Sequence, residues 1–199
     1  MTALPKRKSA DEIKTLKTRL LKLLYKKSFQ QNPDPIFRLS SGRMSPYYIN
    51  AKKTTLDPEG AYLIGKIIFR LIRGLQADGI GGLTLGADPI AGAVALTSFI
   101  EKKPIPAFII RKEPKGHGTQ AWLEGSLPSG ARVVVLEDVV TTAASALKAI
   151  EKLKEAGHTV IKVIALVDRQ EGGEQNLAEA GYTLDALFNL DDLKTLSAS

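Results

Sequence analysis

The sequence of 199 residues contains no cysteine and no long apolar run. The lack of cysteine excludes disulfides, thiolate nucleophiles and cysteine-based metal sites, and it suits a reducing cytoplasm. No apolar segment approaches the ~20 residues that span a bilayer, and the first residues, with Lys6-Arg7-Lys8, lack the apolar stretch of a secretion signal. The Gly-x4-Gly-Lys-Ser/Thr pattern is also missing, which disfavours a Walker-type nucleotide hydrolase. We therefore expect a cytoplasmic protein with no membrane partner.

An excess of basic residues is confined to one end of the chain. The net charge is +7, and residues 1–30 hold nine Lys and Arg against two Asp and Glu, so the other 169 residues are balanced. A basic segment can bind RNA or another polyanion, but a solvated helix face of the same composition is more common. No interleaved aromatic residues or nucleic-acid motifs accompany the segment. We therefore expect no nucleic-acid partner.

Apolar strands and helices alternate along most of the chain. Residues 11–28 have apolar residues at helical spacing, and Asp57-Pro58 predicts the start of a helix that ends near Arg73. Further strands are expected at 36–39, 47–50, 82–85, 105–110, 132–136, 160–167 and 182–188, further helices at 90–102, 145–156 and 174–180, and a polar loop at 111–125. This order predicts an α/β fold with a mostly parallel central sheet flanked by helices. We expect one domain over residues 1–199, with residues 30–50 as a small N-terminal hood.

The segment from Arg132 to Ser145 combines acids with a helix start. An apolar strand ends in Glu137-Asp138, and small hydroxyl and methyl side chains then lead into a helix. Backbone amides at a helix N-terminus bind phosphate, while carboxylates beside them accept hydrogen bonds from sugar hydroxyls or face a magnesium ion. A sugar phosphate fits this order of residues. An ordinary strand-to-helix turn with an acidic flank fits the spacing equally well.

This segment resembles the signature with which type I phosphoribosyltransferases bind phosphoribosyl pyrophosphate (PRPP). The resemblance implies the type I phosphoribosyltransferase fold, with Glu137 and Asp138 on the ribose hydroxyls. It also implies that the residues that follow bind PRPP, and these are Val139, Val140, Thr141, Thr142, Ala143, Ala144 and Ser145. Many members have glycine in place of Ala143 and Ala144, and we expect the loop to bind phosphate despite the two methyl groups.

A loop with several cations follows the predicted strand at 105–110. Its sequence, Arg111-Lys112-Glu-Pro-Lys115-Gly-His117-Gly, meets the Arg-Lys-x-x-Lys-x-His-Gly pattern of the orotate branch of the family. Cations there suit a pyrophosphate leaving group, and histidine can donate a proton to it, although charged loops are usually only solvated turns. The resemblance implies that all four residues bind PRPP, with Lys112, Lys115 and His117 as the catalytic residues. It also implies a homodimer in which the loop reaches the neighbouring subunit's site.

Two other segments resemble the orotate branch. Residues 37–50 contain its Ser-Gly-x-x-Ser-Pro core, which implies a hood over the base with an aromatic residue, Tyr48, near the pyrimidine; Ser40 stands where some members have lysine. Asp168-Arg169 follows a predicted strand, and arginine can bind a carboxylate through two hydrogen bonds. By itself this dipeptide is a surface turn. The resemblance implies that Arg169 and Thr141 bind orotate.

Taken with these resemblances, the sequence predicts an orotate phosphoribosyltransferase activity. The reaction would join the ribose 5-phosphate of PRPP to orotate, giving orotidine 5′-monophosphate and pyrophosphate in de novo synthesis of the pyrimidine nucleotide UMP. The resemblance implies Mg²⁺ as cofactor, bound mainly to PRPP oxygens, and no protein metal site. Two alternatives remain at this point: a phosphoribosyltransferase for another base, and a regulatory relative that binds RNA through its basic end.

Overall fold

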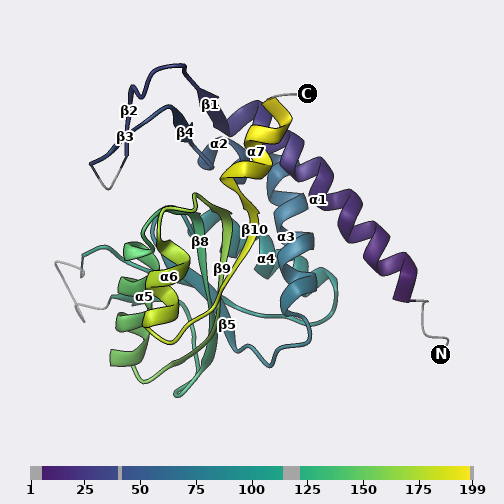
Figure 1. Ribbon diagram of the computed structural model, residues 1–199. Helices are drawn as coiled ribbons and strands as arrows, with labels where there is room; N and C mark the ends of the chain where they lie inside the picture. Colours follow the sequence, from purple (N-terminus) through teal and green to yellow (C-terminus); the bar gives the residue numbers. More distant parts are fainter. Residues whose placement is uncertain (1–5, 40–41, 114–121, 198–199) are drawn as a thin grey trace.

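The computed structural model describes residues 6–39, 42–113 and 122–197, with a twisted sheet between two helical layers (Figure 1). Within these residues the central sheet contains six strands in the order β10-β9-β8-β5-β6-β7. The strands are β5 (Gly79–Leu83), β6 (Ala107–Ile110), β7 (Leu123–Glu124), β8 (Arg132–Val140), β9 (Thr159–Asp168) and β10 (Leu184–Asn189). All neighbours pair in parallel except β6 and β7. The predicted α/β fold with a mostly parallel sheet is confirmed.

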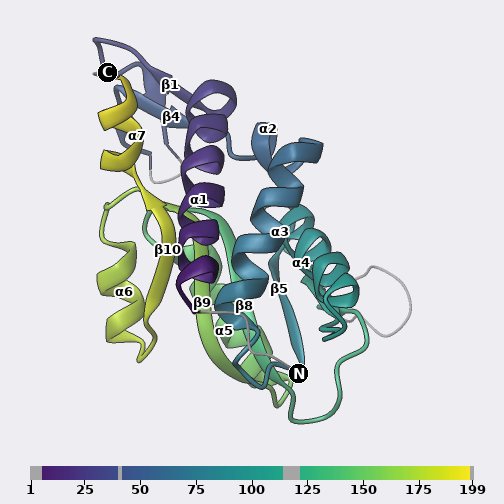
Figure 2. The same cartoon turned by 90° about the vertical axis from the view of Figure 1, so that its right-hand side faces the viewer.

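The two faces of the sheet are covered by different helices. The helices α1 (Lys6–Ser28), α3 (Pro58–Ile72) and α4 (Asp88–Ile100) lie on one side, and α5 (Ala144–Glu155) and α6 (Gly173–Glu179) on the other (Figures 1 and 2). Buried residues of β8 alternate between the faces, as strand geometry requires: Val134 and Leu136 pack toward α3, and Val133 and Val135 toward α5. The sheet is therefore buried on both sides, which explains its apolar strands.

The start of α3 shows how local sequence fixes an element. The Asp57 side chain accepts hydrogen bonds from the backbone N–H groups of Glu59 and Gly60, both at 3.1 Å, and Pro58 occupies the first turn. Proline has no N–H group to leave unpaired there, and the carboxylate satisfies two free helix donors. The predicted helix from Asp57 to about Arg73 is confirmed.

The hood consists of two short antiparallel pairs. In one, β1 (Phe29–Gln31) pairs with β4 (Tyr47–Ile49), and in the other β2 (Phe37–Arg38) pairs with β3 (Met44–Ser45). A short helix, α2 (Lys52–Thr55), leads from β4 back to α3. Figure 1 shows these strands beyond the end of the sheet at which β9 turns into α6, which is the carboxyl end of the parallel strands.

Several predicted boundaries were wrong. The loop predicted at 111–125 contains β7, an edge strand of two residues, which is too short to show alternation. Strand β8 continues four residues past Leu136, because its pairing with β9 extends to Val140 opposite Asp168. Two helices were not predicted, α2 and α7 (Leu190–Ser197), and α7 packs on α1. In the part of the chain that the structure describes, no helix is both long and apolar enough to cross a membrane.

Candidate functional site

The acid pair lies at the carboxyl end of β8, in the middle of the sheet. Glu137 and Asp138 belong to the strand itself, and they are only 7% and 9% exposed. Strands β9 and β5 flank β8 on its two sides, so their ends fix the position of both acids. In open parallel sheets ligands bind outside this edge, where the strands lead into helices. The structure therefore puts the predicted pair where a ligand is expected.

Glu137 is a buried acid with one oxygen left unpaired. Its Oε2 has no hydrogen-bond partner among the described residues. Burial, and then the charge of Asp138 beside it, raise the pKa of Glu137 from 4.5 to about 8. At pH 7 the group is therefore mostly a neutral carboxylic acid, able to donate one hydrogen bond as well as accept one. A sugar hydroxyl has the matching donor and acceptor.

Asp138 is in contact with a cation that the sequence did not suggest. The Lys52 Nζ, from α2, lies 3.4 Å from the Asp138 Oδ2, and the backbone N–H of Val139 donates to Oδ1 at 2.9 Å. Gly86, in the loop after β5, also lies against this carboxylate, since a Cβ there would come within 2.5 Å of Oδ1. Lys52 had no signal beyond its place after the hood, because only the fold brings it to Asp138.

The loop after the acids surrounds a small hollow of about 170 Å³. Its lining consists of Glu137, Val139, Val140, Thr141, Thr142, Ala143, Ala144 and Ser145, which are the predicted PRPP-binding residues of this segment except Asp138. The hollow opens at the N-terminus of α5, where backbone N–H groups and the helix dipole favour an anion. Ala143 has a left-handed backbone (φ +63°), a conformation that favours glycine. The structure thus identifies Ala143, rather than Ala144, as the strained departure from the family pattern.

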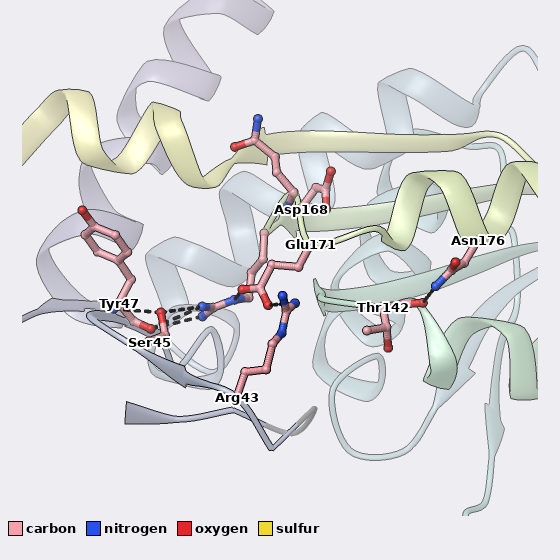
Figure 3. Close-up of polar contacts among 9 residues, drawn as sticks. Arg43, Ser45, Tyr47, Thr142, Asp168, Glu171 and Asn176 are labelled. Atoms are coloured by element: carbon pink, nitrogen blue, oxygen red, sulfur yellow. Dashed lines mark hydrogen bonds and ion pairs between the residues drawn. The ribbon is translucent and has the colours of Figure 1, made fainter. Parts of the chain in front are cut away.

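Arg169 binds the hood at Ser45 and Tyr47, which are labelled in Figure 3. Its side chain is 4% exposed, and it donates to the Ser45 Oγ at 3.2 Å, to the Tyr47 carbonyl at 3.3 and 3.4 Å, and to the Glu171 Oε1 at 2.9 Å. Glu171 in turn accepts from Arg43 of the hood at 2.5 Å. These contacts use four of the five N–H groups of Arg169, so one group on Nη1 is left for a ligand among the described residues.

The predicted aromatic residue, Tyr48, is partly exposed within the hood. Its ring stacks on Phe37, with ring centres 5.6 Å apart, and the residue is 37% exposed. The preceding residue, Tyr47, stacks on Phe29 and supplies the carbonyl that binds Arg169. The structure does not bring Tyr48 into contact with Arg169.

The cationic loop begins beside a second hollow of about 530 Å³. Arg111 and Lys112 line it together with Thr84, which follows β5, and Asp88, the first residue of α4. Strand β5 lies between β6 and β8. Arg111 pairs with Glu124 at 3.3 Å. Both cations follow β6, so β5 lies between them and the acid pair, and neither of them lines the hollow that adjoins that pair. Lys115 and His117 lie outside the described residues.

Comparisons with known proteins identify relatives of this chain. Residues 56–183 match the model of the phosphoribosyl transferase domain family. The chain is 51% identical to the orotate phosphoribosyltransferase of Aquifex aeolicus, over 88% of this chain and 96% of that protein. It is 50% identical to the orotate phosphoribosyltransferase of Nostoc sp., over 92% and 87%. The chain belongs to the orotate phosphoribosyltransferase family.

Solved structures of this family have the same fold. The Mycobacterium tuberculosis H37Rv orotate phosphoribosyltransferase in complex with PRPP is 32% identical, with a TM-score of 0.73 over 90% of this chain and 99% of that one. The same enzyme in complex with inorganic phosphate gives 33% identity and a TM-score of 0.77, over 90% and 99%. The predicted type I phosphoribosyltransferase fold is confirmed.

Proposed function

We propose that the chain transfers the ribose 5-phosphate of PRPP to orotate, giving orotidine 5′-monophosphate and pyrophosphate in de novo UMP synthesis. The observation that carries the proposal is the sequence of groups along β8 and α5. A neutral acid and a Lys52-paired carboxylate are followed at once by a hollow at a helix N-terminus. Family membership agrees with it, and so does the M. tuberculosis relative's complex with PRPP.

In this proposal the protein aligns two substrates and stabilises charge. Glu137 and Asp138 hold the ribose hydroxyls, and the loop Val139–Ser145 holds the 5-phosphate. A ring nitrogen of orotate forms a bond to the anomeric carbon as the carbon–oxygen bond to pyrophosphate breaks, so no protein nucleophile is required. The proton of that nitrogen leaves with the released pyrophosphate or passes to water. Arg111, Lys112, Lys115 and His117 bind the diphosphate, whose negative charge grows as it leaves. Thr141, Tyr48 and the remaining N–H group of Arg169 bind orotate.

Mg²⁺ fits this site as a partner of the substrate. No cluster of three or more His, Asp or Glu side chains is found among the described residues, and Glu137 is mostly neutral at pH 7. Asp138 is the carboxylate nearest the ribose position and already has Lys52 beside it. These donors suit a cation held mainly by PRPP oxygens, where it supplies charge neutralisation to the diphosphate.

We also propose a homodimer with shared active sites, in the cytoplasm. Large apolar side chains are exposed along α4 and the loop before it: Leu85, Leu96, Phe99 and Ile100 are each 63–72% exposed. Apolar patches of this kind are typical of protein–protein interfaces. Leu85 follows Thr84 of the second hollow, so a partner packed here would reach the Arg111–Lys112 end of the cationic loop. The single domain of residues 1–199, with its hood over the base, belongs to the same proposal.

The decisive experiment is spectroscopic. Orotate absorbance should fall only when PRPP and Mg²⁺ are both present, and orotidine 5′-monophosphate should accumulate in equal amount. Turnover of another base with orotate unchanged would favour a phosphoribosyltransferase of different specificity. Salt-dependent RNA binding without turnover would favour the regulatory alternative.

A further inference from the structure

One carboxylate joins two arginines that are far apart in the sequence. Glu171 accepts from the Arg43 Nη2 at 2.5 Å and from the Arg169 Nε at 2.9 Å. Figure 3 shows Arg43 extending from the hood toward Glu171. Without the carboxylate, the two guanidinium groups would lie near each other with like charge. Glu171 therefore fixes the direction in which the Arg43 side chain points.

The two arginines differ in what they can still bind. Arg169 is almost fully buried, and four of its five N–H groups already have acceptors in the protein. The Arg43 side chain is 59% exposed, and among the described residues only Glu171 accepts from it. A guanidinium group has five N–H donors, so Arg43 has four to offer to a ligand. Of the two, Arg43 is much better supplied for binding a carboxylate.

The loop that carries Glu171 lies directly against the loop Val139–Ser145. The Arg169 N–H donates to the Val140 carbonyl at 2.8 Å. A Cβ at Gly173 would lie 2.8 Å from the Thr141 carbonyl, so no space separates these backbones. The Asn176 side chain also donates to the Thr142 carbonyl at 2.9 Å. Glu171 lies two residues before Gly173, which contacts Thr141. It therefore holds Arg43 at the same edge of the site as Thr141.

We propose that Arg43 is a second base-binding cation, which binds the carboxylate of an acidic pyrimidine and which Glu171 positions. The inference rests on the proposed function, because it concerns the base of that reaction. Two parallel hydrogen bonds from a guanidinium group to a carboxylate would discriminate against bases that lack the acid. Arg43 is then the specificity-determining residue, while Arg169 holds the hood and contributes one donor.

The test compares orotate with its uncharged methyl ester in wild type and in Arg43→Gln. The KM of orotate, and the KM or Ki of the ester, are measured at saturating PRPP and Mg²⁺. Arg43→Gln should raise the orotate value at least about tenfold, about 1.4 kcal/mol, and change the ester value less than about twofold. Glu171→Gln should reduce the preference for orotate in the same direction but to a smaller extent. The KM of PRPP should stay within about twofold in both variants.

Glu12→Gln is the matched control, because Glu12 also pairs with a distant arginine, Arg70, at 2.7 Å, but on the helices α1 and α3. Equal losses for orotate and ester in Arg43→Gln would mean that Arg43 only holds the hood, and would overturn the proposal. An unchanged preference in Arg43→Gln would overturn it too, and an unchanged preference in Glu171→Gln would remove the positioning role. A wild type that does not consume orotate would instead refute the proposed function itself.

Discussion

The two halves of the candidate site are built in different ways. The ribose–phosphate half occupies nine consecutive residues, Glu137 to Ser145, at the end of a strand paired on both sides. The base half joins the hood to the loop after β9 through contacts that span 122 to 128 residues. The first is fixed by backbone pairing and burial, and the second by side-chain hydrogen bonds and ion pairs. A contiguous half can be recognised in a sequence, whereas an assembled half requires the fold.

The largest effect is expected where the ribose half meets the cationic loop. Asp138→Ala and Lys112→Ala should each lower turnover at least about a hundredfold, because each removes a charge aligned with PRPP. When the two variants are refolded together, half of the dimers are mixed. If Lys112 serves the partner's site, each mixed dimer has one intact site, and about a quarter of all sites recover. Turnover of the mixture, relative to wild type, is the measurement.

The same mixture can contradict the shared site. If Lys112 serves its own subunit, each site in a mixed dimer has one defect and nothing recovers. Native mass spectrometry of differently tagged chains would show that mixed dimers had formed. An inactive mixture with mixed dimers present would place the whole site within one chain.

On the base half, Arg169→Ala should weaken orotate binding far more than PRPP binding. Truncating one partner of a buried charged pair costs about 2–5 kcal/mol, and here the hood also loses its bonds to Ser45 and Tyr47. The orotate KM should therefore rise at least about thirtyfold, while the PRPP KM changes less than about threefold. Arg169→Lys should restore little, because lysine lacks the planar set of donors. Equal losses for both substrates would show that the two halves are not independent.

The sequence predicted the strand before Glu137 and the helix after Ser145 because the signals for these elements are local. The apolar run before Glu137 and the cap at Asp57 depend on neighbours within a few residues, and the structure confirms the elements that they predicted. The boundary after Leu136 was wrong because strand length depends on the partner strand. The left-handed backbone of Ala143 had no signal in the residues of this chain, since alanine rarely adopts it, and only the glycine found there in many family members pointed to it.

The base half was predicted only in outline. The hood and Arg169 came from the family resemblance, but the contact between them did not, because nothing in either segment indicates the other. The same holds for Lys52, which contacts Asp138 only because the fold places α2 beside the end of β8. The bridging position of Glu171 had no sequence signal either, because it depends on Arg43, 128 residues away.

Glu137 predicts how stability depends on pH. Its pKa is raised to about 8 in the folded protein from 4.5, so folding favours the protonated form. The contribution of Glu137 to the free energy of unfolding is therefore fully present below about pH 4.5. It is lost as the pH rises toward 8, by at most about 1.4 kcal/mol for each pH unit. Glu137→Gln keeps a neutral group of the same shape and should remove this dependence. In urea unfolding at fixed protein concentration, the free energy of unfolding of the variant, relative to that of wild type, should rise by a few kcal/mol between about pH 5 and about pH 8.

Glu155→Gln, on α5, is the control for removing an acid that is not buried, because the pair of Glu155 with Lys152 lies at the surface. If the difference between Glu137→Gln and wild type were constant over the pH range, Glu137 would be ionised in the folded protein. The ribose half would then contain two negative charges, and the proposed hydrogen bond from a neutral acid would be wrong.

The smallest change in stability is expected for Ala143→Gly. Comparing it with Ala144→Gly tests whether the backbone strain lies at Ala143. A left-handed backbone costs alanine about 1–2 kcal/mol, but Ala143→Gly also loses a buried methyl group and gains freedom in the unfolded chain. The net change should lie within about 1 kcal/mol of zero, and PRPP affinity should change less than about tenfold. Ala144→Gly, in the first turn of α5, relieves no strain and should destabilise by about 0.5–1 kcal/mol. Thermal unfolding of both variants should thus give the higher Tm to Ala143→Gly, and the reverse order would mean that the loop carries no strain at Ala143.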